Sequence, residues 1–349
     1  MKKVNDQILR LTTVIILLLV CVCAIVRCSA QSTPRKSLLA LSKKEHMLSI
    51  VDPVSFKIIA RIPVGEDPHE VIASEDGKTA YVCNYGGGSF HELNIIDLAA
   101  QKPLSNFDTR PLFGPHDITF VNGKAWFTAE GSKAVGRYDP VTGKLDWSMG
   151  TGQDRTHMIH VSADGKKIYT TNISSGTVSI LSDLVMQPGK MASPGAKARE
   201  EWTHTIVPVS KGVEGFDVSP DGTELWTASA GDGTIFIIDL HTKKLKSTID
   251  AKVMGANRLK FTPDGKLVFI SSLQTGELTV YSAKDHTKVK QLKLGNGAAG
   301  ILMDPDGARA FVACSADNYI AVIDLKKLED VQHLDVGGVP DGMAWAIQQ

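Results

Sequence analysis

The sequence predicts an all-β chain assembled from copies of one unit, and three observations lead to this prediction. The segment from Phe216 to Asp239 alternates apolar and polar residues in strands that flank a tight Pro220-Asp221-Gly222 turn. Similar turns return along the chain, with their glycines at Gly77, Gly123, Gly165, Gly222, Gly265 and Gly307. Their spacing of 42 to 57 residues is close to the length of one four-stranded antiparallel blade, so we expect a β-propeller.

The first thirty residues read as an export signal. Three basic residues, Lys2, Lys3 and Arg10, precede an uncharged and mostly apolar run over residues 11–26, and small residues follow at positions 28–30. We expect cleavage before Gln31, which leaves residues 31–36 as a polar linker and directs the protein to the periplasm, the cell surface or the medium. The alternative is a retained anchor helix, but an apolar run of this length is short for a bilayer. We expect no membrane span after cleavage.

Charge and cysteine content limit the choice of partners and cross-links. The whole chain has 38 basic and 38 acidic residues, and residues 31–349 carry a net charge near −3. This balance argues against binding to nucleic-acid phosphates, so we expect no nucleic-acid partner. Beyond the signal, Cys83 and Cys314 fall in units that are not neighbours, and we expect no disulfide between them.

The two ends of the chain share one unit. Residues 37–62 contain three expected strands with no first strand ahead of them, and the segment from Pro340 to Ala346 supplies the missing strand. Pairing these segments closes the ring and leaves no open sheet edge. We therefore expect a single seven-bladed β-propeller over residues 37–349, and we expect it to be a monomer.

Two insertions depart from the repeated pattern. Residues 181–202 lengthen the third spacing and are rich in Pro, Gly, Lys and Ala, whereas residues 86–91 add a glycine run. We expect both to be solvated loops on the rim of the ring; the alternative is that they are binding loops.

The strands also resemble a known repeat. The segment from Tyr169 to Leu181, together with Tyr81-Val82-Cys83-Asn84 and the turn at Ser219 to Gly222, is similar to the YVTN β-propeller repeat of exported and cell-surface proteins. The resemblance covers nearly all of residues 31–349 and implies the fold, because the shared residues are those that build blades. More distantly, the architecture is similar to the propellers of lactonases and amine dehydrogenases, a likeness that transfers no individual residue.

One position of the repeat is rich in functional side chains. Aligning the units on the turn glycine places one residue of each unit near the start of its first strand: His69, His116, His157, Glu214, Asn257, Ala299 and Asp341. First strands lie innermost in a propeller, so we expect these seven residues to point at one axis. Three consecutive blades present an imidazole there.

Two interpretations of the three histidines stay open. In the first, His69, His116 and His157 converge with Glu214 to bind a divalent metal such as zinc, copper or iron, or they orient an anion or another polar ligand. A metal with an open coordination position would be able to activate water. In the second interpretation, each histidine forms hydrogen bonds with the adjacent blade and has only a structural role.

Other polar residues are expected around the same opening. We expect Asn84, Tyr85, Glu130, Asn172 and Ser229 there if the second strands end on this face, together with two arginines from the starts of first strands. Arg155 and Arg258 are suited to bidentate binding of a carboxylate or phosphate. The alternative for each arginine is an ordinary surface position.

Catalytic signatures are absent from residues 31–349. There is no Gly-x-Ser-x-Gly, no His-Glu-x-x-His and no Cys-x-x-Cys-His motif. We therefore favour a non-enzymatic exported propeller that binds a small molecule, a metal or a protein partner at the channel mouth or rim loops. The alternative is a lactonase-type hydrolase or lyase with a His/Glu site at the mouth. A weaker third interpretation, an accessory of a haem or quinone redox system, requires a cofactor that the sequence has no motif to attach.

Overall fold

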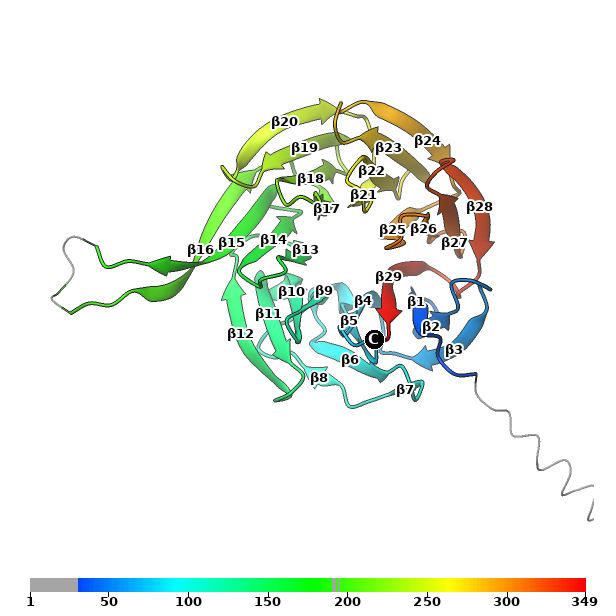
Figure 1. The fold of residues 1–349 in the computed structure, drawn as a ribbon, viewed down its shortest axis with the longest axis horizontal. Helices are drawn as coiled ribbons and strands as arrows, with labels where there is room; N and C mark the ends of the chain where they lie inside the picture. Colours follow the sequence, from blue (N-terminus) through cyan, green and yellow to red (C-terminus); the bar gives the residue numbers. More distant parts are fainter. Residues whose placement is uncertain (1–30, 190–192, 194) are drawn as a thin grey trace, which may run out of the picture. The chain divides into compact units, whose positions relative to one another are not determined.

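Seven antiparallel sheets follow one another around a central channel (Figure 1). The computed structural model describes residues 31–189, 193 and 195–349, so the expected export signal at residues 1–30 lies outside the described residues. All the sheets belong to the unit Thr33–Gln349. The predicted all-β, seven-bladed propeller is confirmed.

Blades 1 to 6 are built from consecutive strands. Blade 1 consists of β4 (Pro68–Ala73), β5 (Thr79–Asn84), β6 (Glu92–Asp97), β7 (Lys102–Pro103) and β8 (Phe107–Asp108). Blade 2 consists of β9 (Pro115–Val121), β10 (Lys124–Ala129), β11 (Ala134–Asp139) and β12 (Lys144–Gly150). Blade 3 consists of β13 (Thr156–Val161), β14 (Lys167–Asn172), β15 (Thr177–Met186) and β16 (Arg199–Pro208).

The later blades repeat this pattern. Blade 4 consists of β17 (Val213–Val218), β18 (Glu224–Ser229), β19 (Thr234–Asp239) and β20 (Lys244–Asp250). Blade 5 consists of β21 (Ala256–Phe261), β22 (Leu267–Ser272), β23 (Glu277–Ser282) and β24 (Lys288–Lys293). Blade 6 consists of β25 (Ala298–Met303), β26 (Arg309–Cys314), β27 (Tyr319–Asp324) and β28 (Glu329–Leu334). Two 3₁₀ turns, η1 (Gly86–Gly88) and η2 (Glu130–Ser132), follow second strands.

Blade 7 joins the two ends of the unit, as the sequence predicts. It consists of β29 (Pro340–Ile347), β1 (Lys36–Ser42), β2 (Met47–Val51) and β3 (Ile58–Pro63). The antiparallel register of β29 and β1 runs from Lys36 opposite Ile347 to Ser42 opposite Pro340. This pairing leaves no open edge between the first and last blades.

Buried apolar side chains fill the spaces between neighbouring blades. Between blades 7 and 1, for example, the cluster includes Leu39, Ile50, Val82 and Ile96, all fully buried. Cys83 and Cys314 are buried and free. Within the part of the chain that the structure describes, no helix is long and apolar enough to cross a membrane.

One of the two insertions differs from the expectation. β15 and β16 continue their pairing from Thr177 opposite Pro208 out to Met186 opposite Arg199, so both flanks of the insertion form a two-stranded ribbon and not a loop. Figure 1 shows this hairpin projecting beyond the ring. Trp202 anchors its base by packing on Trp147, with ring centroids 4.9 Å apart. Cross-strand pairs therefore extend the blade where composition alone indicates a loop.

Glycines allow the innermost strands to approach one another closely. A Cβ atom added to Gly300 in β25 would lie 2.3 Å from the backbone oxygen of Asp341 in β29, the next innermost strand. Gly215 in β17 would similarly meet the backbone oxygen of Asn257 at 2.4 Å. A side chain at these positions would push two blades apart.

We predict that Gly300→Ala lowers the free energy of unfolding by about 1–3 kcal/mol, because the added methyl group overlaps the adjacent backbone. The measurement is chemical denaturation followed by tryptophan fluorescence. Gly150→Ala is the matched control, because a Cβ atom there has no neighbour within 4 Å and it ends an outer strand. Equal effects of the two substitutions would show that the blades do not depend on this contact.

Candidate functional site

The seven aligned residues all lie at one end of the channel. Each is the second residue of its innermost strand, from His69 in β4 to Asp341 in β29. All seven line a cavity of about 260 Å³, which we call the mouth pocket. Its other lining residues are Lys43, Tyr85, Arg155, Arg258, Leu273, Ser315 and Val339. The pocket therefore brings the aligned positions of all seven blades together.

The three predicted histidines pack against one another. The ring centroids of His69 and His116 are 4.6 Å apart, and those of His116 and His157 are 3.8 Å apart. The Tyr85 ring lies edge-on to both His69 and His116, at 4.9 and 5.0 Å. Three consecutive blades thus form an arc of imidazole and phenol rings on one side of the pocket.

This arrangement does not fit the metal-site hypothesis. Among residues 31–189, 193 and 195–349, no group of three or more His, Cys, Asp or Glu side chains is arranged to hold a metal ion. The His116 and His157 rings pack directly against each other, tilted by 36°. The Lys43 ammonium lies 2.8 Å from His69 Nε2, where it would repel a bound cation.

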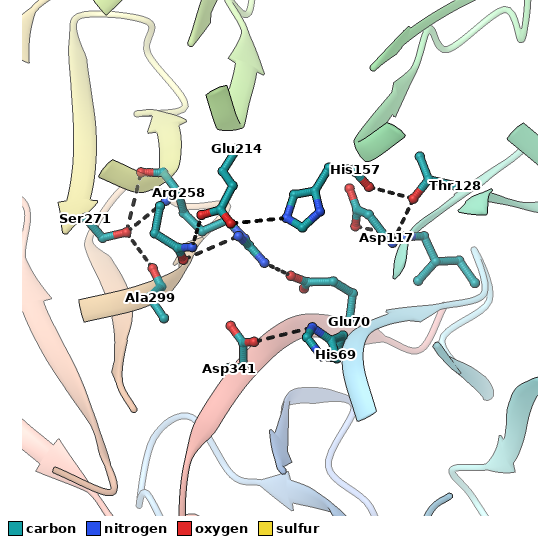
Figure 2. A network of polar contacts seen from close by, with 12 residues as sticks. His69, Glu70, Asp117, Thr128, His157, Glu214, Arg258, Ser271, Ala299 and Asp341 are labelled. Carbon is teal, nitrogen blue, oxygen red and sulfur yellow. Dashed lines mark hydrogen bonds and ion pairs between the residues drawn. The ribbon is translucent and has the colours of Figure 1, made fainter. Parts of the chain in front are cut away.

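A salt bridge across the channel forms the floor of the mouth pocket. Arg258 in blade 5 donates through Nη2 to Glu70 Oε1 in blade 1, on the opposite side of the ring (Figure 2). The Arg258 guanidinium also donates through Nη1 to Asn257 Oδ1, at 3.3 Å. Arg258 lines both the mouth pocket and a second cavity of about 340 Å³, so the salt bridge lies between the two.

Burial shifts the pKa values of Glu70 and Arg258, the two residues of this salt bridge. Burial raises the pKa of Glu70 above its ordinary value, and the nearby Asp341 and Asp117 carboxylates add to this rise, although Arg258 opposes it. Burial disfavours the charged form of Arg258, but Glu70, Asp341 and Glu214 outweigh it and raise the pKa of Arg258. Arg258 therefore stays charged and favours the ionised form of the buried Glu70 carboxylate.

Two further carboxylates hold histidines at the rim. A hydrogen bond between Asp67 Oδ1 and His69 Nε2, at 3.0 Å, lowers the pKa of Asp67 to about 2 although burial opposes this. Burial also opposes ionisation of Glu130, but His157, Tyr85 and Arg155 outweigh it and lower the pKa of Glu130 to about 2. The Arg155 Nε donates to Glu130 Oε1 at 2.8 Å. Both carboxylates are therefore ionised at neutral pH.

Some buried polar atoms at the mouth have no hydrogen-bond partner among the residues that the structure describes. These include His116 Nδ1 and Asp341 Oδ1, on side chains whose residues are 2 % and 8 % exposed. Burial, together with the neighbouring His157 and His69, lowers the pKa of His116 well below its ordinary value. The lowered pKa makes His116 a neutral imidazole at pH 7.

Hydroxyl groups of the second strands position the aligned residues. Thr128 Oγ1 in β10 donates to the backbone oxygen of His157 at 2.6 Å, and Ser271 Oγ in β22 donates to that of Ala299 at 2.6 Å. Thr171 in β14 makes the equivalent bond to the backbone oxygen of Glu214. In each case one blade fixes the backbone of the next, so the pocket is formed before any ligand arrives.

Four of the residues expected around the opening do not line the mouth pocket: Asn84, Glu130, Asn172 and Ser229. Asn84 is fully buried and donates through Nδ2 to Glu92 and Asn94 within its own blade. Asn172 is likewise fully buried, and its amide bonds to Thr156, Thr177 and Ser179. Neither asparagine lines the mouth pocket. Glu214, by contrast, lies 3.8 Å from His157 Nε2 and accepts a hydrogen bond from Asn257, both within the pocket.

Sequence reasoning did not single out Lys43 or Glu70. Lys43 Nζ is 3.4 Å from Asp341 Oδ2 and follows β1, in the same place as Tyr85 after β5 and Glu130 after β10. Aligning the second strands of all seven units would have found Lys43. Glu70 directly follows an aligned residue, and only its reach across the channel distinguishes it.

Comparisons with known proteins support the fold. The chain aligns with a protein of unknown function from Desulfotomaculum acetoxidans at a TM-score of 0.71 and 13% identity, covering 90% of this chain and 99% of that one. A protein described as a putative 6-phosphogluconolactonase from Bacteroides uniformis gives 0.71 and 16% identity, covering 89% and 100%. Hydrazine synthase from Kuenenia stuttgartiensis gives 0.63 and 17% identity, covering 80% and 89%. No family model and no curated protein matches the sequence.

We predict that Arg258→Met destabilises the fold by about 3–5 kcal/mol at pH 7, because it leaves the buried Glu70 carboxylate without its partner. The pKa of Glu70 is already raised, and losing Arg258 raises it further, so the penalty grows as pH rises above the ordinary value of 4.5. Denaturation at pH 7 and pH 5 measures this difference, and we expect a smaller loss at pH 5.

The control is the double variant Arg258→Met/Glu70→Leu, which removes both charges. It should recover most of the lost stability at pH 7, because an apolar pair replaces the salt bridge. A double variant as unstable as Arg258→Met, with no pH dependence in either, would show that the charge pair does not hold the two sides of the channel together.

Proposed function

We propose that this protein is an exported propeller that binds a small polar molecule in the mouth pocket. One observation carries the proposal: His116 Nδ1 and Asp341 Oδ1 are buried in the pocket lining without hydrogen-bond partners. Leaving a buried polar atom unpaired costs about 1–3 kcal/mol. A ligand that bonds to these atoms would recover that free energy.

Size and rigidity support a small ligand. A cavity of about 260 Å³ lies just below the range typical of sites for drug-sized molecules. Its walls are fixed by hydrogen bonds between blades, such as Thr128 to the backbone of His157, so little free energy is lost in ordering them. Within the pocket, charged, neutral polar and apolar side chains lie side by side, which favours a small ligand with at least one polar group.

The test is a binding screen on the purified chain. We expect at least one member of a panel of small carboxylates, amino acids, amines and sugars to raise the melting temperature, with calorimetry giving its Kd. His116→Ala should weaken that binding at least tenfold, equivalent to about 1.4 kcal/mol. His241→Ala is the control, because His241 is exposed in a turn outside the pocket. Equal affinities of the two variants would remove His116 from the site.

A second candidate function is hydrolysis of a lactone. The lowered pKa of His116 leaves an unprotonated imidazole at neutral pH, and a free Nδ1 is suited to take a proton from an attacking water molecule. Two structural neighbours are described as putative 6-phosphogluconolactonases. A cavity of about 260 Å³ is small, which favours an unphosphorylated sugar lactone.

We predict for this second candidate that the chain opens unphosphorylated sugar lactones, releasing acid that a pH-stat records. The rate should fall at least 100-fold in His116→Ala, because general-base catalysis typically contributes that factor. It should stay unchanged in His241→Ala. Binding of the lactone without acid release above the uncatalysed rate would leave the ligand-binding function alone.

A further inference from the structure

The residue two positions before each aligned residue has a left-handed backbone in every blade. These residues are Asp67, Gly114, Arg155, Gly212, Gly255, Gly297 and Val339, with φ between 49° and 86°. The left-handed turn directs each chain into its innermost strand. Glycine adopts this conformation without strain, and four of the seven blades use it.

In the other three blades, a residue other than glycine adopts the left-handed conformation at this position, where glycine would be less strained. Asp67, Arg155 and Val339 have φ of 49°, 57° and 53°. A β-branched residue such as Val339 is a clear outlier in this region, because its side chain crowds the backbone. Strain of this kind gathers at functional sites, where binding or catalysis requires a particular side chain.

These three residues border one side of the mouth pocket. They belong to blades 7, 1 and 3, and blade 2 between them contributes His116. Arg155 and Val339 line the pocket, and Asp67 holds His69 through its hydrogen bond. The blades with glycine on the opposite side, 4 to 6, present Glu214, Asn257 and Ala299. Asp67 and Arg155 thus precede two histidines of the arc and Val339 precedes Asp341, whereas the blade of His116 keeps glycine, Gly114, at this position.

We propose that Arg155 and Val339 are specificity-determining residues of the mouth pocket, that Asp67 positions His69 for the same ligand, and that the ligand is a small carboxylate with a short apolar group. This inference rests on the proposed binding function and deepens it. It assigns the strain at all three positions to ligand recognition.

The chemistry of the two lining residues defines the ligand. Arg155 uses Nε for Glu130, and its half-exposed guanidinium leaves the two terminal nitrogens without a further carboxylate partner among the described residues. Such an edge binds a carboxylate bidentately. Val339 is 37 % exposed, and Leu273, also in the lining, is 43 % exposed, so apolar surface faces the same space. A short hydrocarbon group would cover it.

The experiment compares stability and butyrate affinity in the same variants. Val339→Gly should raise the melting temperature by about 1–3 °C, because it relieves backbone strain and exposes little apolar surface. The same substitution should weaken butyrate binding at least threefold and abolish the preference for butyrate over acetate. A purely structural role for Val339 predicts that stability falls and that affinity does not change.

Matched variants separate strain from recognition. Lys252→Gly is the control, because Lys252 has φ of 56° but is exposed at the end of β20, outside the pocket; it should leave butyrate affinity unchanged. Arg155→Lys keeps the charge and the backbone but removes the bidentate edge, and should weaken butyrate and acetate alike at least tenfold. Asp67→Asn retains a residue that tolerates this backbone and should weaken both threefold or more.

Two results would overturn the inference. If Val339→Gly lowers the melting temperature and Arg155→Lys binds butyrate like the wild type, these residues serve the fold and not the ligand. If the wild type binds an amine or a sugar of the panel but not butyrate, the carboxylate assignment is wrong while the proposed binding function stands. If nothing in the panel binds, the proposed function itself fails.

Discussion

The pairing of β29 with β1 is the contact on which the rest of the molecule depends. Each blade buries its faces only against its neighbours, so an open ring would expose two blade faces and two sheet edges. The same pairing completes the mouth pocket, because it brings Asp341 at the start of β29 beside Lys43 at the end of β1. Ring closure and assembly of the site are therefore one event.

Local chemistry explains why the fold is predictable from the sequence. Turn glycines such as Gly222 and alternating strands such as Lys144–Gly150 are set by neighbours along the chain, and they recur at a regular spacing. Equivalence between repeats then places His69, His116 and His157 around one axis without knowledge of any contact. The repeat pattern does not predict the direction in which a side chain points or how far it reaches. The bond from Arg258 to Glu70 spans the channel and joins residues 188 positions apart.

The same limit explains where the expected site and the structure differ. Asn84 and Asn172 end second strands as expected. Their side-chain amides, however, form hydrogen bonds with hydroxyl, carboxylate and amide groups of the same blades. Three histidines and a glutamate are suitable metal ligands by type, yet the His116 and His157 rings pack against each other at a tilt of 36° and the Lys43 ammonium lies beside His69. Residue type indicates which chemistry is available, whereas packing decides which part of it faces the pocket.

The propeller separates stability from recognition. Apolar clusters between blades, such as the one around Leu39 and Val82, lie away from the axis, so the mouth can hold unpaired and strained groups without loss of the fold. Most blades keep glycine at the left-handed turn, as at Gly212, Gly255 and also Gly114 before His116. Arg155 and Val339 depart from glycine there, and both line the mouth pocket. At these two positions the strained backbone therefore lies beside the pocket.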